Sequence, residues 1–366
     1  VVELPAELLG ADLDVVIRLR PTHDGAQLMG AHGGQAQGEH GAGAEPSRLH
    51  EPAAAADTRQ TRLPDATRVG GVYLRVTNLA RSIAFYRDII GLQVLETSGH
   101  VAALAPFGSR DALVTLHEAP GVNPVARRGT YGLYHFAILL PDRAALGRFV
   151  THLIRAGVRY GMSDHLVSEA IYLNDPDGLG IEVYIDRPRD AWPRLNGQLT
   201  MATDPLDVAS LLRAAGTTAW NGAPAGTTMG HIHLHVGDLE RARRFYADAL
   251  GFDVVVDSYP GALFMSAGGY HHHLGTNTWA PGPSPSPDQA QLLEWTLIVP
   301  TLTDAHRVAE RLLAAGAPAF ANGDDWLVVA TEVKDPRNFN QNFVTTTHFK
   351  LEADGKGWDP QPCTSR

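Results

Sequence analysis

The sequence of 366 residues contains a single cysteine, Cys363, so internal disulfide bonds do not hold the fold together. It also lacks any uninterrupted apolar run near the roughly 20 residues that a membrane-spanning helix needs. Both absences favour a protein of the reducing cytoplasm, which is the location we expect. Hydrophobic residues make up 44% of the chain, enough for a buried core in each of two ordinary domains.

Positive charge is also scarce, because 30 Lys and Arg stand against 40 Asp and Glu, for a formal net charge of -10. Proteins that bind nucleic acid or an anionic membrane surface rely on an excess of positive charge. We therefore expect neither nucleic acid nor a membrane as a partner. A small molecule is the expected partner instead.

Residues 1–66 show little that predicts a packed structure, and the stretch from 21 to 60 is rich in Gly, Ala and His without an apolar period. Such a composition is typical of disordered segments. We predict a disordered tail over 1–66 and a second tail over 349–366.

An internal repeat organises the rest of the chain. YLRVTNLARSIAFYRDIIGLQVL, from Tyr73, matches HLHVGDLERARRFYADALGFDVV, from His233, at a constant offset of 160 residues. Each copy opens with period-two alternation, turns at Asn78 or Asp238, and continues at helical spacing to a glycine. This pattern predicts a strand, a turn and a helix that ends at the glycine.

A second, fainter pair alternates with the first: YHFAILLPDRAALGRFVTHLIRAGV from Tyr134 and EWTLIVPTLTDAHRVAERLLAAGA from Glu294. Each member again predicts a strand followed by an amphipathic helix, and short strands follow each helix. We predict an α+β fold of four strand-helix-strands modules. They form two tandem halves, 67–188 and 228–348, joined by a linker over 189–227.

These paired modules, with the segments GLYHFAILLP, DPDGLGIEVYIDRP and YHHHLGTNTW, resemble the vicinal oxygen chelate superfamily and in particular its catechol 2,3-dioxygenase branch. The resemblance covers roughly residues 69–344. It implies βαβββ modules that pair into half-open barrels around a divalent metal. It also implies Fe(II), with Mn(II) as the alternative, O2 as co-substrate, and a small aromatic diol as substrate.

By this resemblance, ligands lie on the first and last strands of the modules. The first-strand positions fall on Gly71, His135, His231 and Glu294. The last-strand positions fall on Val114, on Glu182, on one of His271 to His273, and on Asn342. The implied metal ligands are therefore His135, Glu182 and His231, two histidines and one carboxylate as in oxygen-activating iron enzymes. His233, on the same strand face as His231, is expected to line the cavity.

The implied ligands all belong to modules two and three. We therefore predict that these two modules share one barrel, and that modules one and four form a barrel without metal. Pairing of modules across two chains would satisfy the same positions. We expect a homo-oligomer.

The stretch DHLVSEAIYLNDPDGLGIE resembles the extradiol ring-cleavage signature, with Ser163 as the one departure before it. The Asp-Pro-Asp-Gly turn should place Tyr172 and Glu182 on adjacent antiparallel strands. The resemblance implies that Tyr172 hydrogen-bonds the substrate or an oxygen-derived intermediate, and that His165 lies over the same region.

A further histidine is needed to exchange protons with the substrate, and a side chain with a near-neutral pKa suits this role. The segment YHHHLGTNTW supplies the candidates. Strand alternation puts His271 and His273 on one face and His272 on the other. Aligning HLGTN with EVYID selects His273, with His272 as the alternative.

The function implied is extradiol cleavage of a catechol to a muconic semialdehyde. A glyoxalase-like isomerase or lyase is the first alternative. It usually has a fourth protein ligand, a place that His273 could fill. A non-catalytic binding protein resembling bleomycin resistance proteins is the second alternative.

Overall fold

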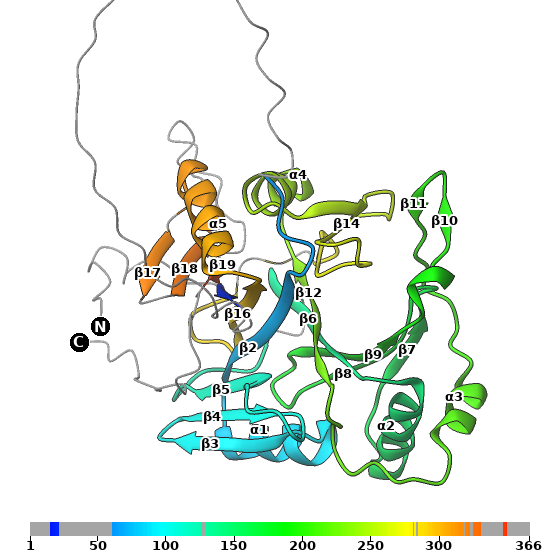
Figure 1. The fold of residues 1–366 in the computed structure, drawn as a ribbon. Helices are drawn as coiled ribbons and strands as arrows, with labels where there is room; N and C mark the ends of the chain where they lie inside the picture. Colours follow the sequence, from blue (N-terminus) through cyan, green and yellow to red (C-terminus); the bar gives the residue numbers. More distant parts are fainter. Residues whose placement is uncertain are drawn as a thin grey trace, which may run out of the picture.

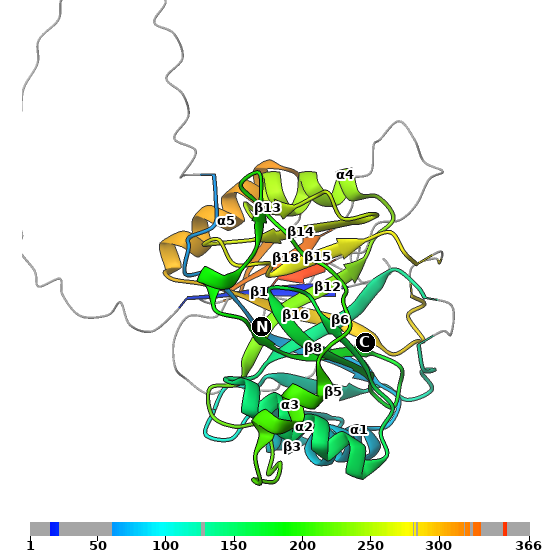
Figure 2. The same ribbon diagram turned by 90° about the vertical axis from the view of Figure 1, so that its right-hand side faces the viewer.

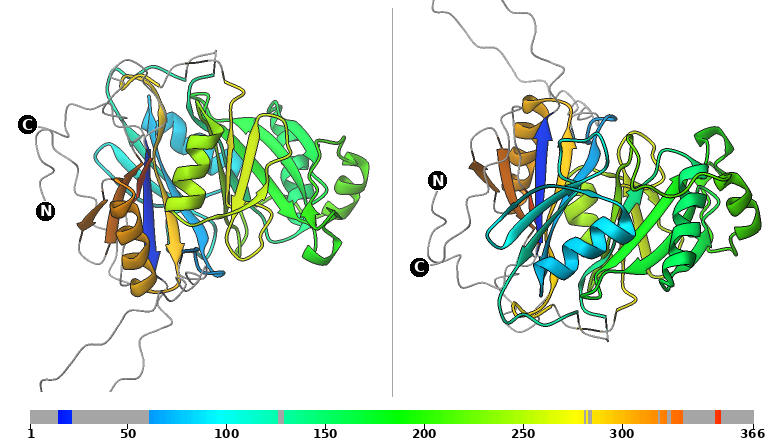
Figure 3. Two further views of the ribbon diagram at one scale, coloured as in Figure 1. Left: turned by 90° about the horizontal axis from the view of Figure 1, so that it is seen from above. Right: turned by 90° about the horizontal axis from the view of Figure 1, so that it is seen from below.

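Two curved sheets lie side by side in the computed structural model (Figure 3). The structure describes residues 15–21, 61–125, 129–280, 282, 285–317, 319–322, 325–330 and 347–349. Within these ranges, none of the helices is both long enough and apolar enough to cross a membrane.

The eight-stranded sheet contains the strands of modules two and three. Its order is β13 (Asp253–Val256), β14 (Ala262–Ser266), β15 (Leu274–Asn277), β12 (Thr228–His235), β6 (Gly132–Leu139), β9 (Gly180–Asp186), β8 (Ser168–Asn174) and β7 (Gly161–Asp164). The first strands of the two modules, β6 and β12, pair antiparallel at its centre. Modules two and three therefore share one sheet within a single chain, as we predicted.

The nine-stranded sheet contains the strands of modules one and four. Among the described residues its order is β17 (Ala319–Asn322), β18 (Asp325–Ala330), β19 (Thr347–Phe349), β1 (Val15–Pro21), β16 (Gln291–Val299), β2 (Arg68–Val76), β5 (Val114–Glu118), β4 (Val101–Ala105) and β3 (Gln93–Ser98). Here β2 and β16 form the antiparallel pair that corresponds to β6 and β12.

One strand of this sheet corrects the expectation of a disordered tail over 1–66. Val15–Pro21 form β1, which runs parallel to β16 and antiparallel to β18 (Figure 3, blue). A seven-residue strand with alternating apolar residues can become ordered by pairing with a sheet. The average composition of residues 1–66 does not reveal so short a strand. Residues 1–14, 22–60 and 350–366 lie outside the described residues.

The helices begin where the sequence predicted. Asn78 and Asp238 cap α1 (Leu79–Phe85) and α4 (Leu239–Ala242), each accepting a hydrogen bond from a backbone N–H three residues on. Both helices continue as π-helices, η4 (Tyr86–Ile90) and η6 (Arg243–Ala249), which the helical spacing did not predict. The other two modules carry α2 (Arg143–Ala156) and α5 (Leu302–Ala314). Figure 2 shows α4 and α5 at one end of the molecule, and α1 and α2 at the other.

The segment predicted as a linker, 189–227, has structure of its own. It contains a 3₁₀ turn η5 (Arg189–Ala191), a hairpin of β10 (Arg194–Leu195) and β11 (Gln198–Leu199), and the helix α3 (Val208–Ala215). Figure 1 shows α3 beside α2, outside the eight-stranded sheet. The close approach requires Gly147, because a Cβ there would overlap the carbonyl oxygen of Leu211.

The Asp-Pro-Asp-Gly turn of module two fastens the two sheets together. The carboxylate of Asp177 accepts hydrogen bonds from the Thr77 N–H at 2.9 Å and the Thr77 hydroxyl at 2.6 Å, and it pairs with Arg81. In the same turn, Asp175 accepts a hydrogen bond from the buried Tyr86 hydroxyl at 3.3 Å. Side chains at the start of α1 and η4 are therefore bound to a turn of the neighbouring sheet.

Candidate metal centre

The strand register brings the three implied ligands together. On the antiparallel pair β6 and β12, Phe136 lies opposite Ile232, so that His135 and His231 occupy equivalent places on the two strands. On the parallel pair β6 and β9, Ala137 lies opposite Glu182. Three adjacent strands thus present one side chain each toward a common point, although 96 residues separate the two histidines.

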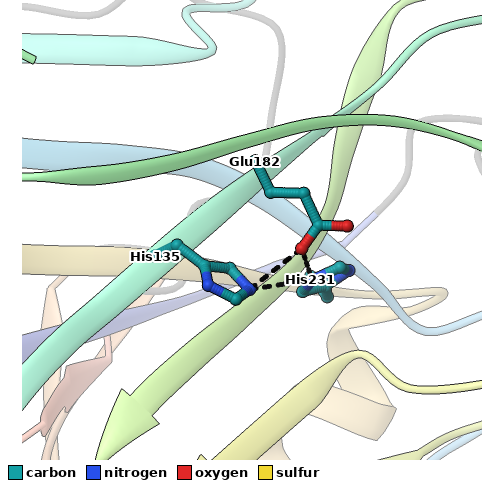
Figure 4. A group of neighbouring side chains, drawn as sticks. All are labelled: His135, Glu182 and His231. Atoms are coloured by element: carbon teal, nitrogen blue, oxygen red, sulfur yellow. Dashed lines mark hydrogen bonds and ion pairs between the residues drawn. The ribbon is translucent and has the colours of Figure 1, made fainter. Parts of the chain in front are cut away.

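The donor atoms of this triad are close enough to share one ion (Figure 4). Oε2 of Glu182 lies 3.0 Å from His135 Nε2 and 3.2 Å from His231 Nε2, and the two nitrogens are 3.3 Å apart. Three donors about 2.1 Å from a single ion, at roughly 90–110° to one another, would show separations of about 3.0–3.4 Å. The side chains present therefore fit a divalent cation.

Burial and charge hold the triad in the form that binds metal. Burial alone would raise the pKa of Glu182, but His231 and His135 outweigh it through charge and hydrogen bonds and hold that pKa well below its usual value. Burial lowers the pKa of His231 to about 4, against the opposing effect of Glu182. An ionised Glu182 beside a neutral His231 is the protonation state in which these two side chains bind a metal.

Two glycines make room for this arrangement. A Cβ at Gly230 would overlap the phenol oxygen of Tyr184, whose ring lies 5.1 Å from the ring of His231. A Cβ at Gly180 would overlap the carbonyl oxygen of Tyr134, in the strand that carries His135. The glycines therefore permit the close strand contacts on which the triad depends.

The structure also brings together the two signature residues that flank the triad. The Nδ1–H of His165 donates to the carbonyl of Ala202 at 2.6 Å, which leaves Nε2 to accept from the Tyr172 hydroxyl at 2.6 Å. Tyr172 lies opposite Glu182 on the antiparallel pair β8 and β9, as the turn predicted, and its ring is 5.5 Å from that of His135. Tyr172 therefore lies beside the three donors, and His165 reaches them only through its hydrogen bond to Tyr172.

The histidine segment behaves differently from our expectation. His271, His272 and His273 precede β15, which begins at Leu274, so strand alternation does not govern them. The ring of His272 lies 4.0 Å from the ring of His231. His273 instead accepts a hydrogen bond from the Ala267 N–H at 3.1 Å and stacks on Phe252 at 6.3 Å. We therefore replace His273 with His272 as the residue beside the triad.

The strand register shows that the alignment of HLGTN with EVYID is displaced by two residues. His233 lies opposite Gly275 on β12 and β15, just as Ala137 lies opposite Glu182 on β6 and β9. Gly275, two residues beyond His273, is thus the counterpart of Glu182. A Cβ at Gly275 would meet the ring of His233 at 2.9–3.0 Å. Module three therefore offers no fourth ligand at this place, and His233 fills the space.

His233 is fixed as a neighbour of the triad. Its Nε2 accepts a hydrogen bond from the Asn277 side chain at 3.0 Å, and its ring lies 5.0 Å from the ring of His135. Burial and the neighbouring histidines lower the pKa of His233 well below its usual value, so it is neutral.

Sequence reasoning missed the residues that the segment 189–227 contributes. Besides Ala202, which orients His165, Thr203 shares a hydrogen bond with the Tyr259 hydroxyl at 2.8 Å. Trp192 packs its ring 5.4 Å from that of His271. The tryptophans and prolines of the segment were a signal of packing, but no local pattern indicates what a connecting segment contacts.

Comparisons with known proteins agree with this architecture. A family model described as the Glyoxalase/Bleomycin resistance protein/Dioxygenase superfamily matches residues 68–183 and 228–337. A catechol-2,3-dioxygenase from Bacillus subtilis (strain 168) is 46% identical over 261 residues, which cover 70% of this chain and 91% of that protein.

Two solved structures show related folds. One is described as a candidate dioxygenase from Bacillus subtilis subsp. subtilis str. 168. It has a TM-score of 0.55 at 13% identity, and the match covers 80% of this chain and 87% of the chain in that structure. Glyoxalase I from Zea mays has a TM-score of 0.46 at 16% identity, covering 78% and 92%. The first likeness supports the fold, and the second is too distant for any argument.

Proposed function

The chain belongs to the Glyoxalase/Bleomycin resistance protein/Dioxygenase superfamily, and from this membership we propose that it is an extradiol ring-cleavage dioxygenase with Fe(II) at His135, Glu182 and His231. It is an enzyme related to catechol-2,3-dioxygenase. The proposed reaction inserts both atoms of O2 into a catechol-type diol and yields a muconic semialdehyde. The proposal includes a role in the breakdown of aromatic compounds by a cytoplasmic homo-oligomer.

The observation that carries the proposal is a donor set of three, with no fourth His, Cys, Asp or Glu added to it from the described ranges. Two imidazoles and one carboxylate lie within hydrogen-bond distance of one another, and Gly275 stands where a fourth ligand would be. Three ligands on one side of an ion leave its opposite positions free for two reactants. The chemistry that Fe(II) supplies when bound is to bring a diol and dioxygen together in adjacent positions.

The side chains around the triad supply the proton chemistry. Burial and the neighbouring histidines lower the pKa of His272 well below its usual value, so this ring is neutral and has a lone pair for a catechol proton. Tyr172, whose pKa burial and Glu182 raise well above its usual value, stays protonated and donates a hydrogen bond. His165 accepts that hydrogen bond in the structure and orients the phenol.

The direct test is anaerobic reconstitution with ferrous ion, followed by catechol and air. We expect oxygen uptake and a yellow ring-cleavage product. Reconstitution with Mn(II) in parallel decides between the two metals, and size-exclusion chromatography measures the oligomeric state. Absence of oxygen uptake with several substituted catechols, in protein that has bound the metal, would contradict the proposal.

A glyoxalase-like isomerase is the alternative, since it uses the same fold. It needs a fourth protein ligand, and His273 was our candidate for that place. Because His273 is engaged by the Ala267 N–H and Phe252, and Gly275 occupies the position equivalent to Glu182, the geometry favours the dioxygenase. A binding protein without chemistry has no need for the buried triad.

A further inference from the structure

A chain of hydrogen bonds leads from the end of β9 to the ring beside the triad. His271 Nε2 lies 2.8 Å from Oδ1 of Asp186, and His271 Nδ1 lies 2.8 Å from Nδ1 of His272. His272 in turn packs its ring 4.0 Å from the ring of His231. Asp186, four residues beyond Glu182 on the same strand, is thus connected to the reaction site through two imidazoles.

The chemistry of the groups fixes the direction of each hydrogen bond. A carboxylate only accepts, so the proton on His271 sits on Nε2. When His271 carries only this proton, its Nδ1 is an acceptor for the Nδ1–H of His272. The lone pair of His272 therefore lies on Nε2. For Nε2, the structure records no hydrogen-bond partner among the described residues.

A second branch ends at the same carboxylate oxygen. Tyr270 donates its hydroxyl proton to Asp186 Oδ1 at 3.0 Å, so the Tyr184 hydroxyl must donate to Tyr270 across 2.6 Å. The Tyr184 ring lies 5.1 Å from His231, and a Cβ at Gly230 would displace it. One acceptor therefore orients the two nearest ring neighbours of His231, which are His272 and Tyr184.

Burial makes this orientation depend on Asp186. The side chains of His271 and Tyr184 are 0% exposed and Tyr270 is 6% exposed, so their polar atoms depend on protein partners for hydrogen bonds. The carboxylate itself is 26% exposed and borders a surface pocket of about 190 Å³. Asp186 is therefore a partly exposed acceptor for side chains that are themselves buried.

We propose that Asp186 and His271 are positioning residues that hold His272 in the tautomer with its lone pair on Nε2, where it takes the proton of a bound catechol. This inference rests on the proposed dioxygenase function. Neither residue touches the substrate. Without the acceptor at position 186, both tautomers of His271 become available, and the lone pair of His272 moves between its two nitrogens.

The first test compares kinetics of the iron-loaded enzyme. Asp186→Ala should lower kcat for catechol by about ten- to a hundredfold, because part of a general-base contribution of about 10²–10⁴-fold is lost. The KM and the iron content should stay within about threefold. Asp186→Glu, which restores an acceptor, should recover part of kcat. His271→Phe should reproduce the loss, and the double variant should be no slower than His271→Phe.

A matched control exists on the other sheet. Glu118 there accepts from a histidine, His100, at 3.2 Å on the surface and far from the triad strands. Glu118→Ala should leave kcat unchanged. A kcat of Asp186→Ala within threefold of the natural enzyme, at equal iron content, would overturn the proposal.

The second test does not depend on activity. In metal-free protein labelled with ¹⁵N-histidine, the His272 signals, assigned by their loss in His272→Gln, should show a protonated Nδ1 and an unprotonated Nε2. Asp186→Ala should change this pattern toward a mixture. An unchanged tautomer in a folded Asp186→Ala protein refutes the positioning role. A natural enzyme that binds iron but cleaves no catechol refutes the proposed function, while the ¹⁵N pattern still decides the tautomer.

Discussion

The two sheets share one framework, but among the residues that the structure describes only the eight-stranded sheet has a donor set. Val72 lies opposite Trp295 in the nine-stranded sheet as Phe136 lies opposite Ile232 in the other. The counterparts of His135 and His231 are therefore Gly71 and Glu294. By the same register the counterpart of Glu182 is Thr115, which lies opposite Tyr73. Our alignment had placed Val114 there, one residue away.

The nine-stranded sheet has also lost the space for a ligand. A Cβ at Gly71 would meet the carbonyl oxygen of Ala112 at 2.6 Å. Arg75 lies on the same face of β2 as Gly71, and its Nε is buried without a hydrogen-bond partner in the described part of the chain. A guanidinium repels cations. The comparison teaches that the repeat conserves strands and registers, while three side chains decide where chemistry takes place.

The largest effect on iron binding and activity is expected when the carboxylate of the triad is removed and compared with its counterpart in the nine-stranded sheet. Glu182→Ala should abolish iron binding and lower activity by at least about a thousandfold, or about 4 kcal/mol of barrier, because two neutral imidazoles alone hold the ion weakly. Iron content and oxygen uptake measure this. The counterpart variant, Glu294→Ala, should keep both. A Glu182→Ala protein with full iron content would contradict the ligand assignment.

A pH-dependent effect tests the turn that joins the sheets. Burial, and next the charge of Asp177, raise the pKa of Asp175 from 3.8 to about 7 against its backbone hydrogen bonds. Between about pH 4 and 7 the unfolded chain releases this proton and the folded chain keeps it. Asp175 therefore lowers the free energy of unfolding as pH rises through this window, by up to about 4 kcal/mol.

Asp175→Asn removes this titration and keeps the side-chain shape. Its stability, relative to the natural protein, should rise between pH 4 and 7 and level off above pH 7. Urea unfolding at several pH values measures the difference. A constant difference across the window would contradict the raised pKa.

A third comparison uses two glycines, Gly230 and Gly71, at which an added Cβ would overlap neighbouring atoms. Gly230→Ala and Gly71→Ala both introduce a Cβ into occupied space and should each lower the free energy of unfolding by about 1–3 kcal/mol. Only Gly230→Ala displaces Tyr184 from His231, so only this variant should weaken iron binding. Calorimetric titration with ferrous ion under anaerobic conditions measures it. Equal iron affinity in the two variants would show that Tyr184 does not support the ligand.

The smallest effect concerns one hydrogen bond. Tyr172→Phe should lower kcat about tenfold, the cost of one lost hydrogen bond of roughly 1.4 kcal/mol, with iron content unchanged. Tyr73→Phe, on the first strand of the nine-stranded sheet, is the control and should keep full activity. Steady-state oxygen uptake compares the two. Equal rates in both variants would remove Tyr172 from the mechanism.

The sequence predicted the triad because its members carry their own signals: His135 and His231 hold the same place on the first strands of their modules, and the Asp-Pro-Asp-Gly turn precedes Glu182. It also predicted the pairing of modules, since ligands occurred only in two of them. The choice of His273 over His272 rested on strand alternation, which does not apply to a segment that precedes β15. Contacts of 189–227 and the strand β1 depend on distant partners, which local patterns do not contain.

The alternating pairing of modules has a consequence for how the chain is made. β2 pairs with β16, and β6 pairs with β12. More than half of the polypeptide must therefore be synthesised before the central pair of either sheet can form. Strand pairs that are so distant in the sequence form slowly. Until they form, the unpaired edges of β2 and β6 can pair with strands of other nascent chains. Neither tandem half of this protein is therefore an independent folding unit, despite the clear duplication in the gene.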